Sequence, residues 1–266
     1  MYERKPMSIP RPLALVTGAS SGIGFELARC CAADGHDLVI TADTDLAAAT
    51  AALQALGAQV TALQVDLAKT EGVDELIEQL QDRPLQVLVA NAGHGLGHAF
   101  LEQEFEALRH VVDTNITGTL YLLHRVVRSM QRRRNGRVLI TGSIAGFMPG
   151  SYQAVYNASK AFIDSFAAAL RDELQGSGVS LTCLMPGATD TAFFARADME
   201  GTALGRGPKD SPAFVAQAGY DAMKAGAPGV VTGWKNKLQV AMAQVTPSPV
   251  AAAMHRRMAE PEAAPN

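Results

Sequence analysis

Residues 17–24 read Thr17-Gly18-Ala19-Ser20-Ser21-Gly22-Ile23-Gly24, and they stand between a short apolar run at 13–16 and a helical pattern. A glycine turn lets backbone amides approach a pyrophosphate without a Cβ atom in the way. The N-terminus of the following helix supplies unpaired N–H groups and partial positive charge. The spacing differs from the commoner Gly-x-Gly-x-x-Gly loop, so a purely structural glycine turn is the alternative to a phosphate-binding one.

Apolar runs and helical patterns alternate from this loop to about residue 185, which is typical of βαβ units. The expected strands are 13–16, 38–41, 60–65, 87–90, 138–141 and 179–185, with a short seventh near 230–231. The expected helices are 22–33, 45–56, 72–82, 104–133 and 152–175. Because the strands are mostly continuous apolar runs, we predict a Rossmann-type α/β fold, a doubly wound parallel sheet of about seven strands with helices on both faces.

Composition narrows the class of protein. The chain has 266 residues, 48% of them hydrophobic and 18% charged, which fits one large globular unit. Its net charge of −3 provides no overall positive field for nucleic acid or an anionic membrane, so we expect neither as a partner. Cys30, Cys31 and Cys183 are an odd number and do not form a disulfide framework. With no export signal and no apolar run long enough to span a membrane, a soluble cytoplasmic protein is expected.

The expected domain organisation is simple. Residues 1–11 form an N-terminal extension, 12–259 a single nucleotide-binding domain, and 260–266 a flexible tail. Between 189 and 209 the regular pattern fails, and three glycines and a proline accumulate. We predict a mobile loop over a site there, with a solvated surface excursion as the alternative.

Tyr156 and Lys160 are four residues apart in a helical pattern, so both side chains project from one face. A free tyrosine has a pKa of about 10, and a neighbouring cation favours the phenolate and lowers that pKa. The phenol can then act as acid or base near neutral pH. Taken alone, the pair occurs often by chance, and a surface or packing role is the alternative.

Further motifs surround this pair in the same order and spacing as in a known family. They are Asn91-Ala92-Gly93, Asn115, Ser143 and Pro186-Gly187-x-Thr189-x-Thr191. Together with the glycine loop and the Tyr156/Lys160 pair, they make the chain resemble the short-chain dehydrogenase/reductase family from residue 13 to 191. The segment after Gly233 departs from the glycine-rich ending of many members, so nothing is carried over there.

The resemblance implies roles for particular residues. Tyr156 would exchange a proton with the substrate oxygen, Ser143 would hydrogen-bond that oxygen, and Lys160 would hold the nicotinamide ribose and tune Tyr156. Asn115 would support a proton relay through water to Lys160. The residues implied in cofactor binding are Gly18, Ser20, Ser21, Gly22, Ile23, Gly24, Asp43, Asp66, Leu67, Asn91, Ala92, Gly93, Tyr156, Lys160, Pro186, Gly187, Thr189 and Thr191. For Asp66, capping the following turn is the alternative to meeting the adenine amino group.

Asp43 bears on the choice between NAD and NADP. It lies one residue after the position where many NAD-dependent members carry an acid, and Ala42 occupies that position. A carboxylate there would accept hydrogen bonds from ribose hydroxyls and repel a 2′-phosphate. NAD is therefore the preferred cofactor, NADP the alternative. Asp43 could instead cap a helix beginning near Thr44.

The residues next to these motifs suggest the substrate. The expected pocket walls are His94, Ile144, Phe147, Gln153, Met185, Phe193 and Phe194. This mostly apolar lining suits a ketone or secondary alcohol with an aromatic, alicyclic or acyl portion, although any of these residues could simply be core. His94 and His98 lack further ligands for a metal site, so no metal is expected. The resemblance implies a homodimer or homotetramer, whereas ordinary core packing explains the same apolar stripe on helix 152–175.

These observations favour an NAD(P)-dependent alcohol dehydrogenase or carbonyl reductase. Two alternatives stay open: an NADPH-dependent 3-oxoacyl reductase, and a dinucleotide-binding regulatory protein that does not turn over. The complete set of Asn115, Ser143, Tyr156 and Lys160 favours catalysis, because a pure binder needs no acid–base tyrosine beside a cation.

Overall fold

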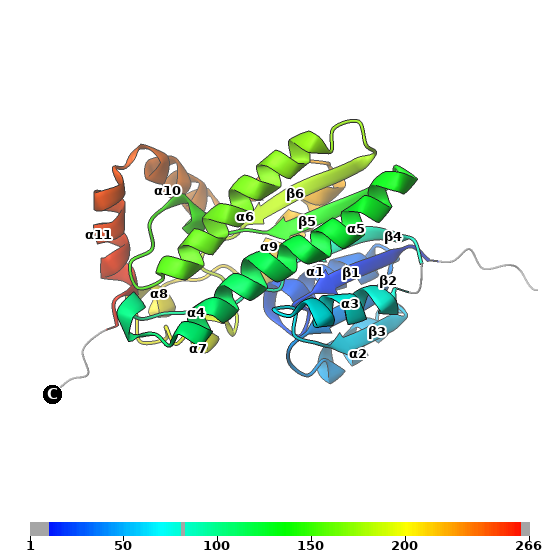
Figure 1. Ribbon diagram of the computed structural model, residues 1–266, viewed down its shortest axis with the longest axis horizontal. Coiled ribbons are helices and arrows are strands. Elements are labelled where there is room, and N and C mark those ends of the chain that lie inside the picture. Colours follow the sequence, from blue (N-terminus) through cyan, green and yellow to red (C-terminus); the bar gives the residue numbers. More distant parts are fainter. Residues whose placement is uncertain (1–10, 81–82, 262–266) are drawn as a thin grey trace, which may run out of the picture.

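A computed structural model describes residues 11–80 and 83–261, and in it seven parallel strands form one sheet in the order β3-β2-β1-β4-β5-β6-β7 (Figure 1). This confirms the predicted doubly wound sheet. The strands are β1 (Leu13–Thr17), β2 (Asp37–Ala42), β3 (Val60–Gln64), β4 (Leu85–Ala90), β5 (Gly136–Thr141), β6 (Val179–Met185) and β7 (Gly229–Val231). The order reverses between β1 and β4, which is where doubly wound sheets open a crevice for ligands.

Helices cover both faces of the sheet. The main ones are α1 (Gly22–Ala33), α2 (Ala47–Gln54), α3 (Thr70–Gln79), α5 (Thr119–Arg133), α6 (Ala154–Glu173) and α9 (Pro212–Lys224). One apolar core joins the sheet to α3, α5 and α6, which pass in front of it in Figure 1, and a second joins it to α1, α2 and α9. Burial on both faces explains why the strands read as continuous apolar runs.

The helix predicted over 104–133 is interrupted. It consists of α4 (Phe105–Val112), a π-helical segment η2 (Asp113–Gly118) and α5. Gly118 passes so close to the carbonyl oxygen of Leu67 that a Cβ atom would lie 1.9 Å from it. Apolar periodicity carries no signal for a single wide turn, so the sequence pattern read as one helix.

The segment predicted as a loop at 189–209 contains regular structure. It holds α7 (Phe193–Arg196) and α8 (Ala203–Arg206), and Thr189 makes a parallel bridge with Asp210. The Thr202 side chain caps α8 by accepting the backbone N–H of Gly205. Helices of four residues are too short to show periodicity, which is why the pattern appeared to fail.

The chain ends in two further helices, α10 (Trp234–Val245) and α11 (Ser248–Ala259). The expected N-terminal extension lies outside the described residues except for Arg11. Of the expected flexible tail only Glu260 and Pro261 are described, and the Tyr152 hydroxyl donates to the Glu260 carboxylate. Within residues 11–80 and 83–261 there is no helix with the length and apolar character to cross a bilayer.

Thr17, at the end of β1, connects the crevice edges. Its hydroxyl oxygen accepts the N–H groups of Asn91 (2.9 Å) and Ala92 (3.0 Å) and donates toward the carbonyl of Val89. The Asn91 side chain donates to the carbonyl of Thr17 (3.2 Å) and accepts from the Thr141 hydroxyl (3.0 Å). These bonds hold the carboxyl ends of β1, β4 and β5 together.

Candidate active site

A cavity of about 730 Å³ lies over the carboxyl ends of the central strands. Every residue implied in cofactor binding lines it, from the glycine loop after β1 to the turn after β6. The cavity continues past α7 and α8 to α10 and α11. The tertiary structure therefore brings motifs spread from Gly18 to Thr191 into one elongated site, at the topological switch point of the sheet.

The glycine loop forms one end of the cavity. Gly18 and Gly22 adopt φ values of +65° and +59°, and a Cβ atom on Gly24 would lie 2.1 Å from the carbonyl oxygen of Gly18. Ser21 precedes α1 without a side-chain capping bond, and no acidic residue lies in the first turn. The first N–H groups of α1 are therefore available to an anion, which fits the phosphates of a dinucleotide.

Asp43 lies along the same end, where its carboxylate contacts the His94 ring at 3.1 Å. That hydrogen bond is the main reason why the pKa of Asp43 is lowered. The capping role for Asp43 is wrong, because α2 begins at Ala47 and its N-cap is Leu46. His94 lines the cavity but pairs with Asp43, so it does not serve as a wall at the apolar end.

Asp66 shows both features expected of it. It lines the cavity at the end of β3, and its carboxylate accepts the backbone N–H of Ala68 at 2.9 Å. One carboxylate oxygen is thus used to cap the turn that leads into α3.

Asn115 lies behind the cavity wall, in the π-helical segment. Its amide oxygen accepts the N–H of His94 at 2.8 Å, and its amide nitrogen donates to the carbonyl of His94 and the hydroxyl of Ser159, each at 2.9 Å. The side chain is therefore fully engaged in holding the loop after β4. The relay through water to Lys160 stays a prediction.

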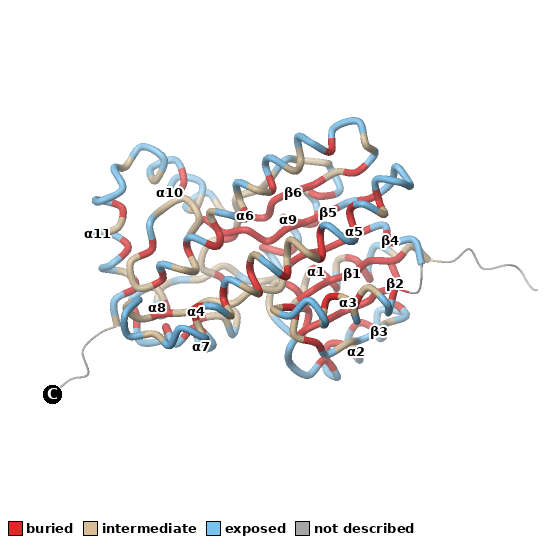
Figure 2. The backbone as a smooth tube through the Cα atoms, in the orientation of Figure 1, coloured by how far each residue is buried: buried red, intermediate tan, exposed pale blue. Residues whose placement is uncertain are grey.

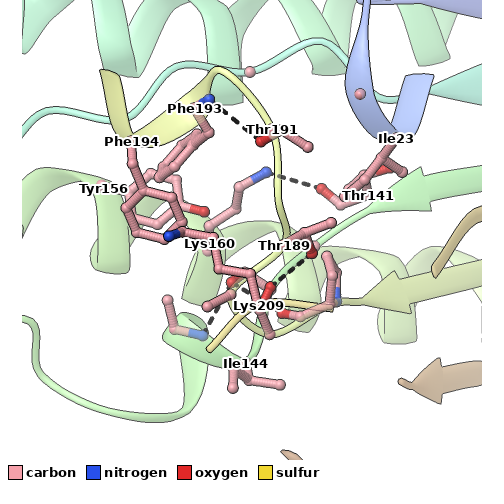
Figure 3. A pocket seen from close by; sticks show the side chains of 18 of the residues that line it. Ile23, Thr141, Ile144, Tyr156, Lys160, Thr189, Thr191, Phe193, Phe194 and Lys209 are labelled. Carbon is pink, nitrogen blue, oxygen red and sulfur yellow. Dashed lines mark hydrogen bonds between the residues drawn. The ribbon is translucent and has the colours of Figure 1, made fainter. Parts of the chain in front are cut away.

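Tyr156 and Lys160 lie together in the cavity (Figure 3), and Ser143 lines it and hydrogen-bonds with Tyr156. The Tyr156 ring packs against Phe193 with 5.1 Å between centroids, and the Lys160 ammonium lies 5.9 Å from the Tyr156 centroid. That ammonium donates to the carbonyl of Thr141 at 2.9 Å. Ser143 also accepts the N–H of Ala145 at 3.1 Å, a bond that stabilises the turn after β5.

The electrostatics of the pair differ from the expectation. Burial raises the pKa of Tyr156 to about 12, and a hydrogen bond with Ser143 opposes that rise only in part. Burial also lowers the pKa of Lys160. The Tyr156 pKa is therefore raised and not lowered as predicted, because desolvation dominates and the Asp164 carboxylate adds to the rise.

Asp164, one helical turn beyond Lys160, is a residue that sequence reasoning missed. Its carboxylate lies against the backbone of Gly142 and Gly146, and it accepts from Ser143 N–H at 3.4 Å. Burial raises its pKa to about 6, against the lowering effect of Lys160. The four-residue spacing from Lys160 was a signal that could have pointed to it.

The expected substrate walls are only partly at the cavity. Ile144, Gln153, Phe193 and Phe194 line it. Phe147 instead lines a shallow hollow between residues 146 and 161, and Met185 packs against the core under the sheet, so both predictions are wrong. Side chains at the apolar end that the sequence did not indicate are Met148, Leu204, Trp234, Gln239, His255 and Met258. Four of them come from α10 and α11, where no motif was recognisable.

No group of three metal-ligating side chains occurs among residues 11–80 and 83–261. His98 pairs with Asp198 at 2.7 Å, and His94 with Asp43. Arg132 and Arg133 lie in the last turn of α5, where positive charge interacts favourably with the helix dipole.

Comparisons with known proteins agree with this geometry. Residues 12–200 match the short chain dehydrogenase family. An uncharacterized oxidoreductase of Myxococcus xanthus is 32% identical over 256 residues, covering 92% of this chain and 96% of that protein. A short-chain dehydrogenase from Sphingobium yanoikuyae, solved in complex with NADPH, superposes with a TM-score of 0.78 at 27% identity over 88% of this chain and 96% of that one. A 3-oxoacyl-[acyl-carrier protein] reductase from Brucella melitensis, in complex with NAD, gives 0.74 at 27% identity over 87% and 99%.

Proposed function

Because the chain belongs to the short-chain dehydrogenase family, we propose that it is an NAD(P)-dependent oxidoreductase that interconverts a ketone and a secondary alcohol. One observation carries the proposal. A single cavity joins the uncapped N-terminus of α1 to the group of Tyr156, Ser143 and Lys160. An anionic cofactor held at the first place would extend to the second.

The chain's own residues supply the proton chemistry. A bound nicotinamide would supply hydride chemistry at the carbonyl or alcohol carbon. In reduction, negative charge develops on the substrate oxygen as its carbon gains hydride, and the hydroxyls of Ser143 and Tyr156 stabilise that charge by donating hydrogen bonds. Tyr156 transfers its proton to that oxygen in reduction and removes a proton in oxidation. Lys160 offsets the charge of the phenolate that reduction leaves behind.

The apolar end of the cavity suggests the substrate class. Phe193 and Phe194 stand beside Tyr156 (Figure 3), and Met148, Leu204 and Met258 continue the lining. Apolar and aromatic walls with few polar groups favour an uncharged ketone or alcohol with a bulky hydrocarbon portion.

A second candidate is NADPH-dependent reduction of 3-oxoacyl thioesters. The Brucella relative carries a name of that kind. Two cations, Lys209 and Lys235, also line the cavity, and Lys209 lies 5.1 Å from the ring of Phe194. Positive charge at a pocket suits the phosphate of an acyl carrier.

We propose NAD as the preferred cofactor. The Asp43 carboxylate lines the cavity, and its lowered pKa keeps it ionised at neutral pH. An ionised carboxylate accepts hydrogen bonds from ribose hydroxyls and repels a 2′-phosphate.

A panel of ketones and secondary alcohols, followed at the absorbance of the reduced nicotinamide with both cofactors, tests substrate class and cofactor together. We expect higher kcat/KM with NAD than with NADP and activity on bulky uncharged ketones. The Asp43→Ala variant should narrow the cofactor ratio by about tenfold, the effect of losing one charged contact of about 1.4 kcal/mol. A clear NADPH preference, or activity on 3-oxoacyl thioesters only, would favour the second candidate.

We also propose that the chain forms a homodimer or homotetramer through α6 and α5. The outer face of α6 exposes Ala158, Phe162, Ser165 and Ala169 at helical spacing, and Phe162 stacks on Phe166. Small residues around an exposed aromatic ring permit close packing of a second helix. Light scattering should give a multiple of 28.0 kDa, and Phe162→Asp should give the monomer. A wild-type monomer at micromolar concentration would contradict the assembly.

A further inference from the structure

The outer face of α10 carries a row of large apolar side chains. Trp234, Leu238, Met242 and Val245 are between 53% and 82% exposed. At about 100° per residue around the axis of α10, these four side chains project within about 80° of one another. Buried Val240 projects from the opposite side of the helix. An exposed apolar row along a whole helix indicates a contact surface rather than scattered surface residues.

The neighbouring helix α11 also exposes apolar side chains. Val250 and Met254 on α11 are about half exposed and lie one turn apart. Figure 2 shows α10 and α11 at one end of the molecule, beside the layers of sheet and helix, with exposed residues along their outer sides. α11 is held in place on its inner side, where His255 contacts the carbonyl of Ser151 at 2.8 Å.

The segment that forms α10 and α11 carries a charge opposite in sign to the net charge of the whole chain. Lys235, Lys237, Arg256 and Arg257 are exposed, and residues 233–259 contain no aspartate or glutamate. The segment therefore has a formal charge of +4 in a chain whose net charge is −3. Around α10, Lys235 and Lys237 project on opposite sides of the apolar row. An apolar helix face bordered by lysines, with a tryptophan at its end, is typical of helices that lie in the headgroup region of a bilayer.

The same two helices also line the apolar end of the cavity. Trp234, Lys235 and Gln239 of α10 line it together with His255 and Met258 of α11. A surface seated on the outer faces of these helices would therefore lie close to the apolar end of the site.

We propose that α10 and α11 dock this protein on an anionic lipid surface, with the apolar row in the headgroup and acyl boundary and the four cations among lipid phosphates. Attraction between the +4 segment and anionic headgroups supplies the electrostatic part of the binding. A second copy of the chain fits this face less well, because a twofold contact would bring +4 against +4. The net charge of the whole chain, which led us to expect no membrane partner, does not describe this local distribution.

Docking would place the apolar end of the cavity near the bilayer. This consequence rests on the oxidoreductase activity proposed above, and it narrows the proposed substrate class to lipophilic ketones or alcohols dissolved in the membrane. The docking itself depends on α10 and α11 alone, so it is tested without cofactor or substrate.

Trp234 is the only tryptophan of the chain, so its fluorescence reports on α10 directly. The full-length protein is titrated with vesicles of phosphatidylcholine and phosphatidylglycerol, and with vesicles of phosphatidylcholine alone. We expect a blue shift of Trp234 emission with the anionic vesicles, quenching by brominated acyl chains, and weaker binding at higher salt. No shift and no sedimentation with anionic vesicles would overturn the proposal.

Variants separate the two contributions. Leu238→Glu with Met242→Glu should lower vesicle affinity at least tenfold, and Lys237→Gln with Arg257→Gln about 30-fold, since each cation near the surface contributes about fivefold. The matched control places the same charges on another exposed apolar pair, Leu101→Glu with Phe105→Glu, and should bind as the wild type. Vesicle binding that resists the Leu238/Met242 change would overturn docking through α10.

None of the Leu238, Met242, Lys237 or Arg257 side chains lines the cavity, so these variants should keep wild-type thermal unfolding and turnover of a water-soluble ketone. A blue shift that depends on protein concentration without vesicles, with an oligomer that the Leu238/Met242 variant dissociates, would assign this face to a second copy and overturn the lipid proposal. If the wild type binds vesicles but shows no activity on any ketone or alcohol, the proposed reaction would be rejected and the docking proposal would stand.

Discussion

Replacing Tyr156 with phenylalanine should lower kcat by about 10²- to 10⁴-fold, the usual contribution of a general acid or base. The substitution removes one hydroxyl and keeps the ring that packs against Phe193. The proton donor of reduction and the acceptor of oxidation are thereby lost, while the glycine loop at the other end of the cavity is untouched. Steady-state turnover with the best ketone and alcohol, and dinucleotide affinity by calorimetry, measure the two effects separately.

The pH profile gives this prediction a second readout. With the pKa of Tyr156 raised to about 12, the phenol is protonated throughout pH 6–9. Reduction needs that protonated form and should change little across this range. Oxidation needs the phenolate, so its kcat/KM should rise up to about tenfold per pH unit, and the Tyr156→Phe variant should lose that rise.

Ser143→Ala is the matched comparison for Tyr156→Phe. It removes a hydroxyl that would hydrogen-bond the substrate oxygen but transfer no proton to it, so turnover should fall while the rise of oxidation with pH is kept. Turnover unchanged in Tyr156→Phe would eliminate the proposed mechanism. If the wild type binds the dinucleotide but turns over no ketone or alcohol, that result would favour the non-catalytic binding protein.

Replacing Gly24 with alanine should weaken dinucleotide binding at least about 100-fold, or about 2.8 kcal/mol. The added Cβ atom would lie 2.1 Å from the carbonyl oxygen of Gly18 and 2.5 Å from the Asn91 side-chain nitrogen. Neither neighbour can move freely. The carbonyl oxygen of Gly18 is part of the main chain, and the Asn91 side chain joins the ends of β1 and β5. The loop must shift away from the N-terminus of α1, where the phosphates are expected to bind.

The same clash should lower the free energy of unfolding by about 1–3 kcal/mol, as overpacking does elsewhere. Urea denaturation measures this loss, and calorimetry with NAD measures the affinity. Gly201→Ala is the matched control, since a Cβ atom on Gly201 meets nothing within 4 Å and both quantities should stay at their wild-type values. Wild-type NAD affinity in Gly24→Ala would place the dinucleotide elsewhere in the cavity.

Sequence reasoning reached the fold because its signals are local. Buried strands such as β6 read as mostly apolar runs, and the expected 179–185 coincides with the observed strand. The helix after the glycine loop was predicted as 22–33, which are the bounds of α1. Each depends on neighbours along the chain, so the pattern is complete without tertiary information.

The candidate site was predictable only where a motif marks it. The four-residue spacing of Tyr156 and Lys160 identified that pair. The residues expected to bind the dinucleotide all line the cavity. Phe147 and Met185 were misplaced because proximity to a motif in sequence does not say to which side of the backbone a side chain points. His94 turned toward Asp43, a partner 51 residues away that no local pattern indicates.

The amino-acid order alone establishes the alternation of strands and helices, the phosphate loop and the pairing of a phenol with an ammonium on one helix, since each arises from contacts within a few residues. Folding decides the rest: that burial raises the pKa of Tyr156 although Lys160 lies near it, that Asp164 lies against the backbone of Gly142, and that α10 and α11 line the apolar end of the cavity. Desolvation and long-range packing depend on atoms that are distant in the chain, and they exist only once the sheet has assembled.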